Sequence, residues 1–182
     1  MVKMLDIRKC CLVVVDVQGN LAQSVYDKDV LFRNIAILIK ATKILGIPII
    51  WCQQCPMALG ATVAHIVKLL ADDEPIDKAS FSCCGKAQFN NKLKTLGRQQ
   101  VLLCGIEAHV CIYQTAIELC EKDYDVEVIA DAVSSRALEN KQIALKKMAT
   151  AGANISCVEM VLFELLRTAE HLQFKQIVRL IK

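Results

Sequence analysis

The sequence contains little glycine, proline or aromatic residue, and its charges almost cancel. Of 182 residues, 7 are glycine, 3 are proline and 5% are aromatic, which excludes collagen-like, low-complexity and disordered chains. The net charge of +3 at pH 7 is too small to indicate nucleic-acid binding or a polybasic membrane anchor. Because 54% of the residues are apolar, we expect one domain spanning residues 1–182 with a full hydrophobic core.

Long apolar runs and a secretory signal are also missing. Runs such as residues 44–52 are far shorter than the roughly 20 residues of a membrane helix, so we expect no membrane partner. The N-terminus lacks the apolar stretch of roughly 7–15 residues that a signal peptide contains. We therefore predict a cytoplasmic protein whose ten cysteines are reduced. A mitochondrial location stays open, although Asp6 disfavours a targeting presequence.

Short apolar runs alternate with longer segments of helical periodicity. Strands are predicted at residues 11–15, 47–52, 100–104, 126–130 and 154–157, and helices at 29–45, 61–70, 86–96, 110–121, 138–150, 160–167 and 171–180. The strands are apolar throughout rather than at alternate positions, which is typical of a parallel sheet covered on both faces. The pattern predicts a three-layer α/β/α fold with a central, mostly parallel sheet of five to six strands.

Nucleotide-binding loops are absent, so the ends of the strands become the main candidates for a site. Neither G-x-G-x-x-G nor G-x-x-x-x-G-K-[ST] occurs, which disfavours dinucleotide binding and phosphoryl transfer. Open sheets of this kind bind ligands outside the carboxyl ends of their strands. Asp16 directly follows the first predicted strand. It could cap a helix or bridge two loops, or it could act in a site if a cation pairs with it.

Cys111 lies where the third predicted strand is followed by a helix. A thiol in the first turn of a helix faces free backbone N–H groups and the positive end of the helix dipole, which favour the thiolate. The same amides can hold an oxyanion. His109 is two positions away and would point to a different side of the helix, so Asp16 fits better as the base. Lys78, in a predicted loop, is either the cationic partner of Asp16 or a solvated surface lysine.

A redox or metal site is the alternative use of the cysteines. Cys52 and Cys55 have C-x-x-C spacing, but Pro56 follows them and no helix is expected before residue 61. The adjacent Cys83 and Cys84 do not form a recognisable second zinc knuckle. We therefore expect no metal and no cofactor.

Taken together, four motifs resemble the isochorismatase-like cysteine hydrolase superfamily, most closely its isochorismatase domain-containing subgroup. They are DVQ at 16–18, KASFS at 78–82, GIEAHVC at 105–111 and DAVSSR at 131–136. The resemblance implies Rossmann-type topology and a catalytic triad of Asp16, Lys78 and Cys111. It also implies a cis peptide bond between Ile106 and Glu107, which aims the Glu107 amide, with that of Cys111, at the substrate oxygen.

The resemblance further implies a hydrolase that cleaves C–N bonds of a small-molecule substrate, an amide or related acyl compound, through a thiol acyl-enzyme. Relatives assemble as dimers to octamers, which implies a homo-oligomer. Nicotinamidases of the superfamily carry a metal-binding Asp-x-His after the second strand, where this chain has WCQQ at 51–54. This difference argues against a metal and against nicotinamide. Isochorismatase itself lacks the cysteine, so Cys111 favours acyl transfer.

Six further residues are predicted by position to line the substrate pocket, although each could instead pack or cap: Gln18, Gln54, Phe81, His109, Tyr113 and Ser135. Two other classes stay open on the same fold, a non-catalytic interaction protein and an RNA-associated, ribonuclease-like protein. The second would need a groove that combines Lys and Arg with stacking aromatic residues. The lysines are instead spread over helices and aromatic residues are few, so a nucleic-acid partner is not expected.

Overall fold

The computed structural model describes residues 3–182. Its strands are β1 (Cys10–Val15), β2 (Ile49–Gln54), β3 (Ile76–Lys78), β4 (Gln100–Ile106), β5 (Asp125–Ser134) and β6 (Asn154–Ser156). They form one six-stranded sheet in the order β3-β2-β1-β4-β5-β6, and every neighbouring pair is parallel. The predicted three-layer α/β/α architecture is confirmed.

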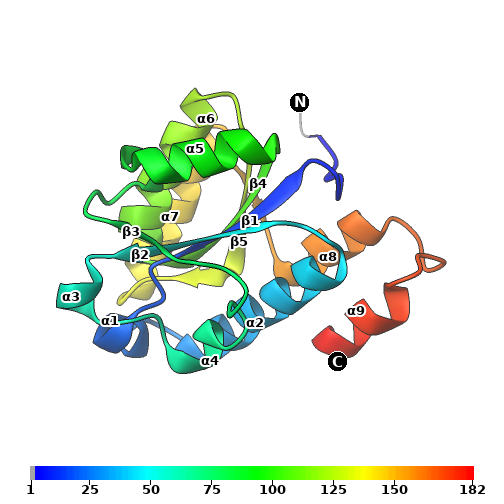
Figure 1. Cartoon of the computed structure of the whole chain (residues 1–182), viewed down its shortest axis with the longest axis horizontal. Helices are drawn as coiled ribbons and strands as arrows, with labels where there is room; N and C mark the ends of the chain where they lie inside the picture. The colour runs from blue at the N-terminus through cyan, green and yellow to red at the C-terminus, as the bar shows by residue number, and fades with distance from the viewer. Residues whose placement is uncertain (1–2) are drawn as a thin grey trace.

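Helices cover both faces of the sheet (Figure 1). On one face pack α2 (Lys28–Ile44), α4 (Ala64–Val67), α8 (Val158–Leu166) and α9 (Phe174–Ile181), and on the other α5 (Ala87–Leu96), α6 (Tyr113–Glu121) and α7 (Leu138–Thr150). Four short helices are α1 (Gly19–Gln23), α3 (Pro56–Leu59), the 3₁₀-helix η1 (Cys83–Gly85) and the π-helix η2 (Ala108–Ile112). Within residues 3–182, no helix combines the length and the apolar character needed to cross a bilayer.

The apolar pattern of the sequence follows from this layering. In β1, Leu12 and Val14 belong to the core beneath α2 and α8, whereas Val13 and Val15 belong to the core beneath α5 and α6. Both faces of the strand are therefore buried, which explains why no polar residue interrupts it.

The sheet has a switch point between β1 and β4. These strands lie side by side, but β2 and β3 extend the sheet from β1 while β5 and β6 extend it from β4. Gly105, with φ of 120°, pairs with Val15, and a Cβ atom at Gly105 would lie 2.0 Å from the Val15 carbonyl oxygen. Glycine thus lets the two strands stay paired up to the edge where ligands bind in open sheets.

Several short elements differ from the sequence analysis: α1 and η1 were not predicted, and two other segments were assigned differently. Lys78 was expected in a loop but is the last residue of β3, a strand too short and too polar to predict from periodicity. No helix was expected between Pro56 and residue 61, yet Pro56 starts α3. This is a position where proline is well tolerated, because the first residue of a helix needs no N–H partner.

Candidate active site

Asp16, Lys78 and Cys111 come together at the carboxyl edge of the sheet. The Lys78 Nζ atom lies 2.7 Å from Asp16 Oδ2, and both side chains are almost completely buried. Asp16 follows β1 with φ of 54°, a left-handed conformation that residues other than glycine rarely adopt. The Cys111 thiol lies beside the same carboxylate, close enough for the two groups to shift each other's pKa.

Lys78 is held as a cation by four oxygen atoms. Besides Asp16 Oδ2, its ammonium donates to Gln54 Oε1 at 2.8 Å, to the Phe81 carbonyl at 3.0 Å and to the Ser80 carbonyl at 3.2 Å. Burial is the largest single influence and favours the neutral amine, but the charge and hydrogen bond of Asp16 together with the neighbouring Cys83 and Cys111 outweigh it, so the pKa of Lys78 is raised. The lysine is therefore a fixed positive charge rather than a proton donor, and it is not the solvated surface residue considered above.

The second oxygen of Asp16 has no partner. Asp16 Oδ1 is buried without a hydrogen bond among the residues that the structure describes. Burial raises the pKa of this carboxyl, although the Lys78 ammonium and the neighbouring Cys111 thiol oppose that shift. A buried acceptor without a donor is costly, and its raised proton affinity suits a general base.

Burial disfavours the thiolate form of Cys111. The residue is 7% exposed, and burial raises the pKa of the thiol far above its usual value, with a further contribution from the Asp16 charge. Both effects oppose the stabilisation of a thiolate that was expected from the start of the helix. A thiol with such a pKa needs a base to take its proton.

The backbone before Cys111 has an unusual course. The Ile106–Glu107 peptide bond is cis. In η2 the Glu107 carbonyl accepts the amides of Val110 at 3.1 Å and Ile112 at 3.2 Å, the two neighbours of Cys111. The Glu107 carboxylate is held by the Nε atom and the backbone amide of Arg136, at 3.1 and 3.0 Å. Arg136 thereby ties the segment after β5 to the segment that carries Cys111.

Three of the predicted pocket residues support Lys78. Gln54 binds it directly and also donates to the Ala79 carbonyl at 2.8 Å. Gln18 is fully buried, and both ends of its amide bind backbone groups of Gln54 and Gly60. Gln18 therefore positions β2 and does not form a pocket wall. Phe81 contributes its carbonyl to Lys78 while its ring is 55% exposed.

The other three predicted pocket residues lie on the far side of η2. Ser135 is completely buried, and its hydroxyl is 2.9 Å from His109 Nδ1. His109 and Tyr113 line a cavity of about 190 Å³ against α7 whose lining does not include Asp16, Lys78 or Cys111. Ser135 is therefore a support for His109 rather than a wall of the crevice.

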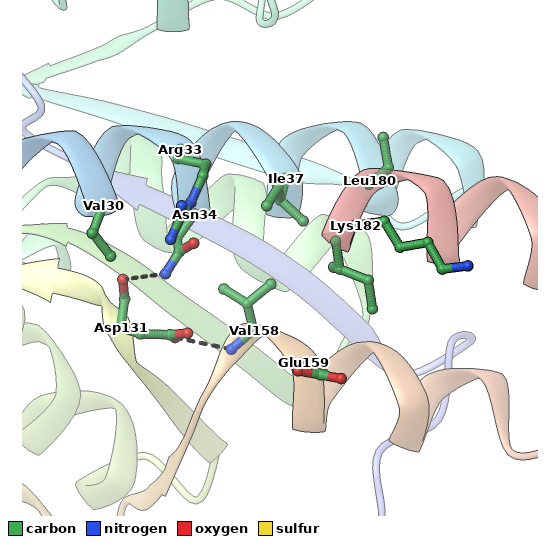
Figure 2. A pocket seen from close by; sticks show the side chains of 10 residues that line it. Val30, Arg33, Asn34, Ile37, Asp131, Val158, Glu159, Leu180 and Lys182 are labelled. Carbon is green, nitrogen blue, oxygen red and sulfur yellow. Dashed lines mark hydrogen bonds between the residues drawn. The ribbon is translucent and has the colours of Figure 1, made fainter.

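Asp131, the first residue of the DAVSSR motif, joins β5 to neighbouring helices. It lies in the wall of a cavity of about 370 Å³ between α2, β5, α8 and α9 (Figure 2). Its carbonyl accepts the Asn34 side-chain amide at 2.8 Å, and its carboxylate accepts the Val158 amide at 2.9 Å. Asp131 thus joins β5 to two helices and does not contact the crevice residues. Between Lys3 and Lys182, no group of three or more His, Cys, Asp or Glu side chains is arranged to hold a metal ion.

Comparison with known proteins identifies the family of this chain. Residues 10–160 match the isochorismatase domain family. The chain is 37% identical to isochorismatase domain-containing protein 2 of Danio rerio over 172 residues, covering 93% of this chain and 85% of that protein. A Caenorhabditis elegans structure described as MAR1 ribonuclease superposes with a TM-score of 0.93 at 36% identity, covering 98% and 92% of the two chains. The fold also matches Escherichia coli YcaC, described as an octameric hydrolase of unknown specificity, with a TM-score of 0.89 at 22% identity, covering 100% and 96%. The chain therefore belongs to the isochorismatase family of hydrolases.

Proposed function

We propose that this protein is a cysteine hydrolase that cleaves the C–N bond of a small amide or a related acyl compound. The observation that carries the proposal is the buried Asp16 carboxylate, which contacts the Cys111 thiol and whose Oδ1 atom has no hydrogen bond from the described residues. A carboxylate fixed by Lys78 and left with one open acceptor can take a thiol proton, which is the step that a neutral nucleophile requires. The proposed chemistry uses no metal or cofactor.

In the proposed reaction, Asp16 removes the Cys111 proton as the sulfur attacks the substrate carbonyl and a C–S bond forms. The tetrahedral intermediate then collapses, the C–N bond breaks, and Asp16 passes its proton to the leaving nitrogen. Water next gives a proton to Asp16 and attacks the thioester. The C–S bond breaks, the acid is released, and the thiol regains its proton. Lys78 stays charged throughout and stabilises the carboxylate.

The developing oxyanion needs donors, and two backbone amides are candidates. The Glu107 amide follows the cis bond, and the Cys111 amide lies between the two amides that bind the Glu107 carbonyl. Loss of one such donor costs about 10²–10³ in rate. The Arg136–Glu107 contact would therefore matter by holding this backbone in place.

The test is a panel of small amides and related acyl compounds, with intact-mass measurement of the protein during turnover. We expect a transient mass increase equal to the acyl group on the wild type and none on Cys111→Ala. Product formation by Cys111→Ala at the wild-type rate contradicts the proposal. Absence of turnover together with a Cys111 that forms no acyl adduct with any compound of the panel would instead favour a non-catalytic interaction protein.

A ribonuclease activity is the second candidate, because the C. elegans structure at 36% identity is described as a ribonuclease. Incubation of wild type and Cys111→Ala with labelled RNA separates the two functions. If both proteins cleave RNA at the same rate, the ribonuclease activity does not depend on the Asp16–Cys111 pair.

Assembly into a homo-oligomer is a further part of the proposal. E. coli YcaC is described as octameric, and this chain exposes several large apolar side chains: Met57, Phe81, Met160 and Leu172. Light scattering on the purified protein measures the mass directly, and a monomer of 20.2 kDa contradicts it.

A further inference from the structure

A groove lies between η2, α6 and α7, and its lining does not include Asp16, Lys78 or Cys111. It consists of two cavities of about 190 and 330 Å³ that share Tyr113 and Lys147. Together they are lined by His109, Tyr113, Asn140, Ile143, Ala144, Lys146, Lys147, Thr150 and Ala151. We refer to these residues as the η2–α7 groove.

Apart from the Tyr113 phenol, every ionisable side chain that lines the groove carries or can accept positive charge. Lys146, Lys147 and His109 contribute, and no Asp or Glu is among the lining residues. Within the described part of the chain, no carboxylate lies in salt-bridge distance of either lysine. The Lys147 ammonium instead lies 4.9 Å from the centre of the Tyr113 ring, an attractive contact that orients the cation. The groove therefore offers a positive charge without a counter-ion.

His109 is oriented by a buried partner. Its Nδ1 atom is 2.9 Å from the hydroxyl of Ser135, which is completely buried. This contact uses one ring nitrogen and leaves Nε2 for a ligand in the groove. Apolar surface lies next to these polar groups, because Ile143 is 56% exposed and Ala144 lines the same cavity. A few convergent polar groups beside apolar surface are what a small-molecule site requires.

The groove is separate from the nucleophile. His109 and Tyr113 stand two positions before and after Cys111, and residues two apart on a helix face opposite sides. Cys111 lies beside Asp16, whereas His109 and Tyr113 lie against α7. A ligand in the groove would thus contact the helix that carries the thiol without reaching the thiol itself.

We propose that the η2–α7 groove binds a small organic anion, in which a carboxylate or phosphate group is attached to a compact apolar body. The anionic group contacts Lys147 and His109, and the apolar body lies on Ile143 and Tyr113. This inference concerns binding alone and does not depend on the hydrolase proposal.

Calorimetric titration of the full chain with benzoate and phenyl phosphate tests the inference, with benzyl alcohol as the neutral analogue and inorganic phosphate as the anion without an apolar body. We expect one site for each organic anion, with binding at least about tenfold weaker for benzyl alcohol and for inorganic phosphate. Higher salt should weaken the binding of both organic anions, since the groove is open to solvent. Lys147→Gln should weaken the binding of both organic anions about tenfold, whereas Lys94→Gln, an exposed lysine on α5, should leave it unchanged.

Three results would overturn the inference. The first is equal binding of benzyl alcohol and benzoate, and the second is equal behaviour of the Lys147→Gln and Lys94→Gln variants. The third is binding that survives Lys147→Gln but disappears after alkylation of Cys111, which would place the ligand in the crevice. A short oligoribonucleotide that displaces benzoate in a Lys147-dependent manner, with inorganic phosphate binding as well as phenyl phosphate, would assign the groove to RNA instead.

Discussion

Cys104 and Cys111 are both buried thiols, and the contrast between their surroundings shows why only Cys111 is proposed as the nucleophile. Cys104 lies in the middle of β4 and is completely buried, and burial raises the pKa of its thiol, as it does for Cys111. The nearest partner of the Cys104 sulfur is the Val13 carbonyl at 3.6 Å, which cannot take a proton. Cys111 has the Asp16 carboxylate instead. Burial alone gives an inert thiol, and an adjacent carboxylate is the feature that Cys111 has and Cys104 lacks.

The largest expected effect separates these two cysteines. Cys111→Ala should lower the rate of amide hydrolysis by about 10⁴-fold or more, because the nucleophile is removed. Cys104→Ala should keep the rate within about threefold and lower the free energy of unfolding by ~1 kcal/mol, because it leaves a small cavity in the core. Initial rates and urea unfolding of both variants provide the measurement. A comparable loss of activity in both would show that the contact with Asp16 does not distinguish Cys111 from Cys104.

The next effect tests the base. Asp16→Asn should reduce hydrolysis by about 10²–10⁴-fold, because no group takes or returns the proton. It should also increase the rate of Cys111 alkylation by iodoacetamide near pH 8. The reason is that the Asp16 charge raises the pKa of Cys111, so its removal lowers that pKa and increases the thiolate fraction. Opposite changes in the two rates would be difficult to explain by a structural defect.

The wild type provides a check that does not depend on the folding of this variant. Because the pKa of Cys111 lies above the usual thiol value of 9.0, its alkylation rate should still rise as the pH passes 9. A plateau below pH 8 would show a preformed thiolate and would contradict the role given to Asp16.

Much of the fold could be predicted from the sequence because long apolar runs carry it. The strand at residues 11–15 and the helix at 138–150 are each covered by buried apolar side chains at regular spacing, and the structure places them within one residue of the prediction. β3 was missed, because its pairing with β2 depends on tertiary contacts and leaves no periodic signal in Ile76–Lys78.

The site was predictable in its residues but not in its electrostatics. Position at strand ends and the resemblance together identified Asp16, Lys78 and Cys111, and the structure brings them together. The raised pKa of Cys111 and the structural role of Gln18 depend on burial and on hydrogen bonds between distant segments. Neither burial nor those partners can be seen in one sequence.

A smaller effect on kcat is expected from a comparison of two neighbouring glutamines of β2. Gln54 and Gln53 are similarly buried, but Gln54 binds Lys78 whereas Gln53 binds Thr62. Each Leu variant should lower the free energy of unfolding by about 1–2 kcal/mol through lost hydrogen bonds. Only Gln54→Leu should lower kcat, about tenfold, because Lys78 loses one of its oxygen partners and holds Asp16 less firmly. Equal kcat values for the two variants would remove Gln54 from the support of the base.

The smallest expected effect concerns the Arg136–Glu107 contact, which holds the backbone next to Cys111. Among the described residues, no such contact holds the backbone next to Cys104. The Arg136 side chain is 63% exposed and lies 3.1 Å from the buried Glu107 carboxylate, so solvent screens the pair and Arg136→Ala should cost at most about 1 kcal/mol of stability. The Arg136 backbone amide keeps its contact with Glu107. We therefore expect only about a two- to threefold loss of kcat, because the Glu107 and Cys111 amides become less well placed. The control is Lys43→Ala, which removes another partly exposed ion pair, with Asp72, and should leave kcat unchanged. Equal kcat values for the Arg136→Ala and Lys43→Ala variants would show that the Glu107 contact does not influence the chemistry at Cys111.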